Sequence, residues 1–113
     1  MGACTFDTIR IVKGDVREAY SEALEEARDY NGHQEGYSGD IQTVNGYRVV
    51  RDFPTYDSKK FWSWIDSRLG NLGKRECEVI EITGAGLKKL KENRGLKGRK
   101  GYRAFMFYGW GAE

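Results

Sequence analysis

The chain has 113 residues, the size of one domain, which excludes a second domain of ordinary length. Hydrophobic residues at 39% and aromatic residues at 13% favour a packed core over disorder, and 32% charged residues predict a polar surface. No apolar run reaches the roughly 18 to 20 residues of a membrane span, and the first residues lack the pattern of a signal peptide. We therefore expect a single domain over residues 1–113, located in the cytoplasm and without a membrane partner.

The first part of the chain predicts a strand followed by a helix. Residues 4–12 form a β-rich stretch. Asp15 and Glu18 then have the spacing of a capping box, in which side chains satisfy the free N–H groups at a helix start. Apolar residues recur at helical spacing behind them, with acidic residues on the other side. We expect an amphipathic helix over residues 15–30.

A hairpin is predicted in the next part of the chain. Asn45-Gly46 separates two β-rich runs, residues 41–44 and 47–51. This dipeptide is the strongest short hairpin signal, because a type I′ turn needs two residues that tolerate positive φ. The two runs are therefore expected to be antiparallel neighbours.

The second half of the chain predicts another helix and two more strands. Asp57 or Ser58 caps a helix that stops at Gly70. This helix is followed by a strand at 75–83, a short helix at 84–93, a loop rich in Gly, Lys and Arg at 95–101, and a strand at 102–110. The last strand is apolar almost throughout, which is typical of a strand that is covered on both faces.

The order β-α-β-β-α-β-β, with the short helix before the last strand, predicts an α+β fold. We expect a mainly antiparallel sheet of about five strands, with the two longer helices on one face. A split β-α-β, ferredoxin-like arrangement is one concrete topology.

The two cysteines, Cys4 and Cys77, both lie in predicted strands. Buried cysteines behave there as small hydrophobic residues, so we expect a reduced, structural pair. A metal site would need clustered Cys or His, and the chain has one His and no Cys-x-x-Cys. The sequence therefore predicts neither a metal site nor a cofactor.

Charge is distributed unevenly along the chain. Residues 1–58 carry 6 basic and 11 acidic groups, whereas residues 59–113 carry 13 basic and 6 acidic groups. Within the second half, a basic region at 86–101, continued to Arg103, has only one acidic residue, Glu92. Such a segment attracts phosphates if the fold presents it on one side. The expected ligand-binding residues are Lys88, Lys91, Arg94, Lys97, Arg99, Lys100, Tyr102 and Arg103. A solvated loop without a ligand is the alternative.

Two further sets of residues have possible functions. Phe61, Trp62 and Trp64 cannot all be buried by one helix face, so Trp62 or Trp64 must lie at an edge, packed there or available to a partner. His33 and Glu35 lie in a glycine-rich turn and are the alternative catalytic residues for general acid–base chemistry. No nucleophile elbow or phosphate loop accompanies them, and a purely structural turn is favoured over catalysis.

Four segments of the chain are distinctive when taken together. They are Met1-Gly2-Ala3 with Phe6, the helix residues Ala19-Tyr20, Ala23 and Ala27, the turn Gly32-His33 with Gly36-Tyr37-Ser38-Gly39-Asp40-Ile41, and the ending Phe105-Met106-Phe107-Tyr108-Gly109-Trp110. With these segments the chain resembles a family of small bacteriophage proteins. The resemblance covers roughly the first 45 residues and the last ten. It implies a phage or mobile-element origin, hence the host cytoplasm, and it implies no mechanism.

The sequence therefore favours a non-catalytic, phage-type binding protein, with inhibition of a host defence system as a fitting role. Its expected partner is a nucleic acid, a nucleotide or a nucleic-acid-handling host protein, bound through the basic region. The alternatives are a small enzyme that uses His33 and Glu35, and a structural or assembly protein. The oligomeric state cannot be deduced from the sequence.

Overall fold

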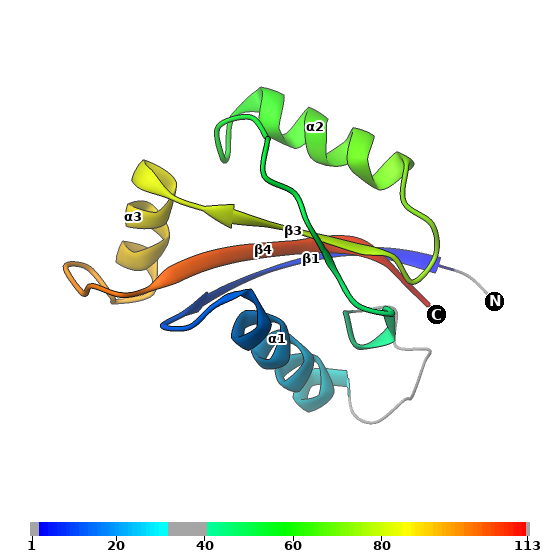
Figure 1. Cartoon of the computed structure of the whole chain (residues 1–113), viewed down its shortest axis with the longest axis horizontal. Helices are drawn as coiled ribbons and strands as arrows, with labels where there is room; N and C mark the ends of the chain where they lie inside the picture. Colours follow the sequence, from blue (N-terminus) through cyan, green and yellow to red (C-terminus); the bar gives the residue numbers. More distant parts are fainter. Residues whose placement is uncertain (1–2, 32–40, 113) are drawn as a thin grey trace.

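A four-stranded sheet with helices on both faces organises the part of the chain that the computed structural model describes, residues 3–31 and 41–112 (Figure 1). The α+β class predicted from the sequence is confirmed. The elements, in chain order, are β1 (Ala3–Val12), α1 (Val16–Asn31), the 3₁₀ turn η1 (Ile41–Thr43), β2 (Arg48–Val49), α2 (Lys59–Gly70), β3 (Cys77–Ile82), α3 (Gly84–Asn93) and β4 (Arg103–Ala112).

The sheet has the order β1-β4-β3-β2, with β4 between β1 and β3 and antiparallel to both. All ten residues of β1 pair with β4, from Ala3 opposite Ala112 to Val12 opposite Arg103. The short β2 pairs with β3 in parallel at the other edge. Two of the three pairings are thus antiparallel, as expected, but the strand order differs from a ferredoxin-like arrangement.

One face of the sheet packs against α1. Val79 of β3 lies opposite Phe107 of β4, and both are buried against Ala19 and Ala23 of the helix. Asp15 caps the start of α1, because its carboxylate accepts hydrogen bonds from the backbone N–H groups of Arg17 and Glu18 at 3.0 and 3.3 Å. Capping and the small alanines explain why this helix forms here and lies close to the sheet.

The opposite face packs against α2. Ile80, Met106 and Tyr108 are buried there against Phe61 and Ile65 of the helix. The expectation that both longer helices share one face is therefore wrong. Figure 1 shows α1 and α2 on opposite sides of the sheet. The burial of both faces of β4 agrees with its unbroken apolar sequence.

The ends of α2 follow the local sequence signals. The hydroxyl of Ser58 accepts a hydrogen bond from the N–H of Phe61 at 3.1 Å, which confirms Ser58 as the N-cap. The helix ends at Gly70, as predicted.

The hairpin predicted around Asn45-Gly46 is wrong, and the sheet therefore has four strands rather than about five. Ile41 is buried in the 3₁₀ turn against the α1 side of the core, and the Tyr47 ring packs 4.8 Å from that of Tyr20. The following segment runs beside β3, where the N–H of Val50 donates to the carbonyl of Val79 at 2.9 Å. Packing of apolar side chains and the open edge of β3 thus override the local turn preference.

Cys77 is buried and Cys4 is half-buried. Burial raises the pKa of Cys77 to about 12, so almost no thiolate forms at neutral pH.

We expect a chromogenic thiol reagent to modify Cys4 in the folded protein and to reach Cys77 only after unfolding. Absorbance should show one fast equivalent in the native chain and none in Cys4→Ser. Equal native rates for the two thiols would contradict the burial of Cys77.

Candidate nucleic-acid interface

The predicted basic region 86–101 consists of most of α3 and the loop that follows it, and α3 spans the residues 84–93 predicted for the short helix. Leu87 and Leu90 of α3 pack against the α2 side of the core, and Lys88 and Lys89 are exposed. At Gly86 the helix α3 lies close to the side chains of Ile82 and Tyr56. A Cβ added there would be 2.9 Å from Ile82 Cγ2 and 3.2 Å from Tyr56 Cδ2. A small residue is therefore required at this contact.

The loop after α3 follows a defined course. Gly95 has a φ of +73°, the N–H of Leu96 donates to the carbonyl of Lys91 at 2.8 Å, and the N–H of Gly95 donates to Glu92 at 3.2 Å. This pair of bonds is a Schellman motif, which closes the helix with a glycine of positive φ. The Lys91 ammonium also donates to the carbonyl of Arg99 and ties the loop to the helix.

Six of the eight predicted ligand-binding residues are exposed cations, and five of these six, all except Arg103, form no ion pair within the described residues. In residues 3–31 and 41–112, none of the five has a carboxylate oxygen within ion-pair distance. They are Lys88, Arg94, Lys97, Arg99 and Lys100. We call α3 and the loop 94–102 the basic end. It is available for anions because these five side chains have no carboxylate partner among the described residues.

The other three predicted residues have structural contacts. Lys91 is half-buried and holds the loop, as described above. Arg103 forms two hydrogen bonds of 2.9 Å to the carboxylate of Glu81 on the neighbouring strand. The half-buried ring of Tyr102 has the Lys13 ammonium 5.2 Å from its centre, a cation–π contact that adds a cation from the end of β1.

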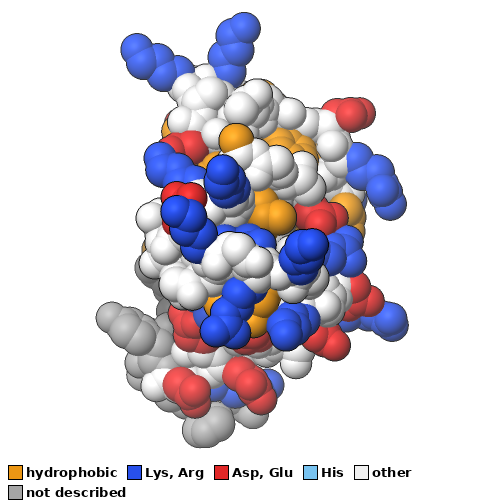
Figure 2. All heavy atoms as spheres, turned by 90° about the vertical axis from the view of Figure 1, so that its left-hand side faces the viewer, with side chains coloured by type: hydrophobic (Ala, Val, Ile, Leu, Met, Phe, Trp, Pro, Cys, Tyr) orange, Lys and Arg blue, Asp and Glu red, His pale blue; other side chains and the backbone are white. Residues whose placement is uncertain are grey.

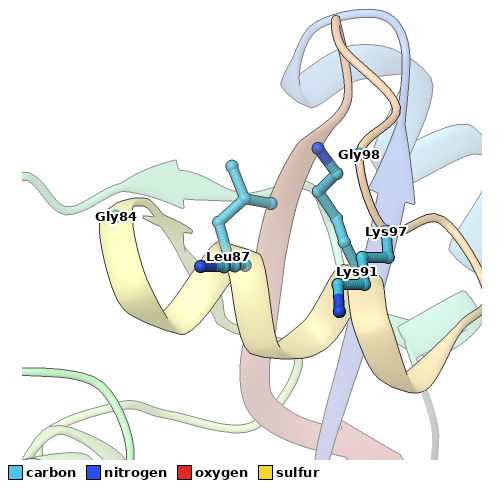
Figure 3. A pocket seen from close by; sticks show the side chains of 6 residues that line it. Gly84, Leu87, Lys91, Lys97 and Gly98 are labelled. Atoms are coloured by element: carbon cyan, nitrogen blue, oxygen red, sulfur yellow. The ribbon is translucent and has the colours of Figure 1, made fainter.

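A hollow of about 350 Å³ lies at the basic end, lined by Gly84, Leu87, Lys88, Lys91, Lys97 and Gly98. Figure 3 shows the Lys91 side chain reaching from α3 toward the loop at Gly98. In Figure 2, Lys and Arg side chains gather over this end of the molecule, and hydrophobic atoms are visible between them. Three lysines and one leucine in the lining suit a ligand that has both phosphates and an apolar part.

The two tryptophans of α2 have different surroundings. Trp62 is 40% exposed, and its indole N–H donates to Asp57 Oδ1 at 2.9 Å. Trp64 is half-buried, with its ring 6.0 Å from that of Tyr108. Trp62 is thus the tryptophan at the edge. The turn 32–40, with His33 and Glu35, lies outside the described residues.

A buried carboxylate is the main feature that sequence reasoning missed. The side chain of Glu78 is 1% exposed and accepts hydrogen bonds from Arg68 Nε at 2.9 Å, Tyr108 OH at 3.0 Å and Arg48 at 3.2 Å. Burial raises the pKa of Glu78, but the hydrogen bonds from Arg68 and Tyr108 and the Arg68 charge lower it more, so the net pKa is below its usual value. The signal was present, because Glu78 interrupts an apolar strand that is covered on both faces.

This network stabilises the fold, and none of its members belongs to the basic end. Its partners come from β2, α2, β3 and β4, so it connects one edge of the sheet with the helix above it. Every buried side-chain nitrogen or oxygen in the described part of the chain has a hydrogen-bond partner. Glu78 is therefore fully engaged as an ion-pair acceptor.

The described residues contain neither a metal-binding cluster nor a helix that could cross a membrane. Within residues 3–31 and 41–112, no three or more His, Cys, Asp or Glu side chains are placed to hold a metal ion. No helix in the same residues is long and apolar enough to span a bilayer. The resemblance to small phage proteins stays a prediction. No protein-family model, curated protein or solved structure matches this chain.

Proposed function

We propose that the chain is a non-catalytic protein that binds nucleic acid through its basic end. One observation carries the proposal: five exposed cations without carboxylate partners in the described structure gather on α3 and the loop that follows it. Their positive charge is balanced by mobile counterions, and a polyanion that displaces those ions gains free energy from their release.

The geometry of the basic end supports a phosphate-bearing ligand over a simple anion. Lys88 and Lys97 line the hollow together with Leu87, so charged and apolar groups are both present. The Schellman motif and the Lys91 bond to Arg99 hold the loop in place, which lowers the entropy lost on binding. No recognition helix for the major groove is evident in the part of the chain that the structure describes, so we expect little sequence preference.

The resemblance to phage proteins adds a wider role to this proposal. Such a protein could inhibit a host defence system by binding nucleic acid, a nucleotide or a nucleic-acid-handling host protein. Only the sequence resemblance supports this part of the proposal.

Salt dependence tests the binding. Three or four phosphate contacts give a log–log slope of about −3 to −4 on duplex, from about −0.9 per contact. The triple variant Lys97→Glu, Arg99→Glu, Lys100→Glu should lose most of this slope and most of the affinity. Fluorescence anisotropy with a labelled oligonucleotide at several salt concentrations measures both quantities.

A matched control distinguishes binding at the basic end from a general effect of the protein's net charge. Arg28→Glu, Arg51→Glu, Lys74→Glu reverses three exposed cations outside the basic end and changes the net charge equally. The control should keep most of the binding. Equal losses in the two triple variants would mean that the basic end is not a site, and absence of binding by the unmodified chain at low salt would refute the proposed function.

A further inference from the structure

The exposed Trp62 lies beside the basic end. Its indole N–H binds Asp57 Oδ1 at 2.9 Å, and Asp57 Oδ2 is 4.0 Å from the ammonium of Lys89 on α3. Tyr56, one residue before Asp57, is in contact range of α3 at Gly86. The first turn of α2 and the helix α3 are therefore neighbours, as their positions in Figure 1 also show.

The Trp62 ring is exposed and yet held in place. The ring of the fully buried Phe61 lies 5.0 Å from it in an edge-to-face arrangement, and the Tyr56 ring lies 6.4 Å away. The bond to Asp57 fixes the indole further, and the Ser58 cap fixes the turn that carries it. A ligand that stacks on this ring would not need to order it first.

The surroundings of Trp62 favour a nucleobase over a protein. In the described part of the chain, Val49 on β2 is the only other exposed large hydrophobic residue, so Trp62 is not the centre of an apolar patch. Protein hot spots need such a patch and are depleted in lysine. Trp62 instead has lysines near it. Lys59 and Lys60 are exposed in the first turn of the same helix, and Lys89 of α3 faces Asp57, the residue that binds the indole N–H.

We propose that the basic end binds single-stranded nucleic acid, with one unpaired base stacked on Trp62 and the neighbouring phosphates held by lysines of α3. This inference rests on the proposed function and adds the form of the ligand. An aromatic ring beside a positively charged surface is the usual arrangement for single strands, whose bases are free to stack. The bases of a duplex are already stacked on each other and do not reach such a ring.

Two variants of Trp62 in the full chain test the inference. Trp62→Leu keeps apolar bulk but removes the aromatic face, whereas Trp62→Phe keeps a flat ring. We expect Trp62→Leu to weaken binding of oligo-dT and oligo-U by about tenfold, within the range of one stacked base, and to leave binding of a blunt duplex unchanged. Trp62→Phe should retain most of the single-strand affinity. Val49→Ala, at the other exposed hydrophobic residue, should change neither.

Competition and salt series by fluorescence anisotropy distinguish the outcomes, and urea unfolding confirms that each variant is folded. Equal affinity for single strand and duplex, with no effect of Trp62→Leu, would overturn this inference and leave the proposed function standing. Absence of binding to every oligonucleotide at low salt would refute both, and Trp62 would then be assigned to a protein partner. Preference for oligo-dT and oligo-U over the blunt duplex would support the inference.

Discussion

Glu78→Ala is expected to lower the free energy of unfolding by about 3–5 kcal/mol. The carboxylate is the shared acceptor for Arg68, Arg48 and Tyr108, so its removal leaves the buried Tyr108 hydroxyl unpaired and the Arg68 guanidinium without its counter-charge. Urea denaturation measures the loss. Glu81→Ala is the matched control on the same strand. The Glu81 side chain is 33% exposed, against 1% for Glu78, and ion pairs of exposed side chains such as Glu81 and Arg103 contribute about 1 kcal/mol or less.

The same carboxylate gives a pH dependence of known sign. Because the pKa of Glu78 is lower in the folded chain than its usual 4.5, the folded state binds this proton more weakly than the unfolded state does. The stabilisation is present above about pH 4.5 and decreases as the pH falls through the folded pKa. Glu78→Gln should therefore show a shallower loss of stability in acid than the unmodified chain. Identical acid profiles for the two proteins would contradict the role given to Glu78.

Gly109→Ala is expected to destabilise the fold by about 3 kcal/mol or more. Gly109 lies opposite Cys77 in the β3–β4 pair, and an added Cβ would be 2.2 Å from the carbonyl oxygen of Glu76 and 2.9 Å from Cys77 Cα. Both atoms belong to the backbone, so neither moves aside without displacing the strand. Thermal and urea unfolding measure the effect.

Gly70→Ala is the control for the glycine substitution. Gly70 ends α2, its φ is not positive, and an added Cβ would have no atom within 4 Å. Alanine favours helix over glycine by up to about 1 kcal/mol, so stability should stay equal or rise slightly. Similar losses at Gly70 and Gly109 would show that the close backbone approach at Gly109 is not the cause.

Helix ends and the central strand could be predicted because short-range chemistry determines them. The hydroxyl of Ser58 needs only an N–H three residues away, and α3 spans the predicted residues 84–93. The apolar run of β4 likewise shows in its own sequence that both of its faces are covered. These signals are independent of the rest of the fold.

The hairpin, the helix placement and the core network could not be predicted in this way. Asn45-Gly46 has a genuine turn preference, but Tyr47 packs against Tyr20 and Phe107, and the segment joins β3 instead. Which face of a sheet a helix covers depends on strand order, which local patterns do not contain.

The candidate site also has one part that local sequence predicts and one part that depends on the whole fold. Its cations are close in the sequence, so their gathering was predictable. The contact of Trp62 with Lys89 through Asp57 depends on how α2 and α3 lie on the sheet.

The pairing of β1 with β4 sets the order in which this protein acquires its structure. β1 is synthesised before the other elements of this fold, but its hydrogen-bonding partner is not made until residues 103–112 have been translated. Until then β3 also lacks the strand that separates it from β1, and the apolar sides of α1 and α2 have only part of a sheet to cover. Contacts between such distant segments slow folding, because a long loop must close before they form. The domain therefore folds late and as a unit after β4 is synthesised, and a nascent chain that stops before β4 keeps its core exposed.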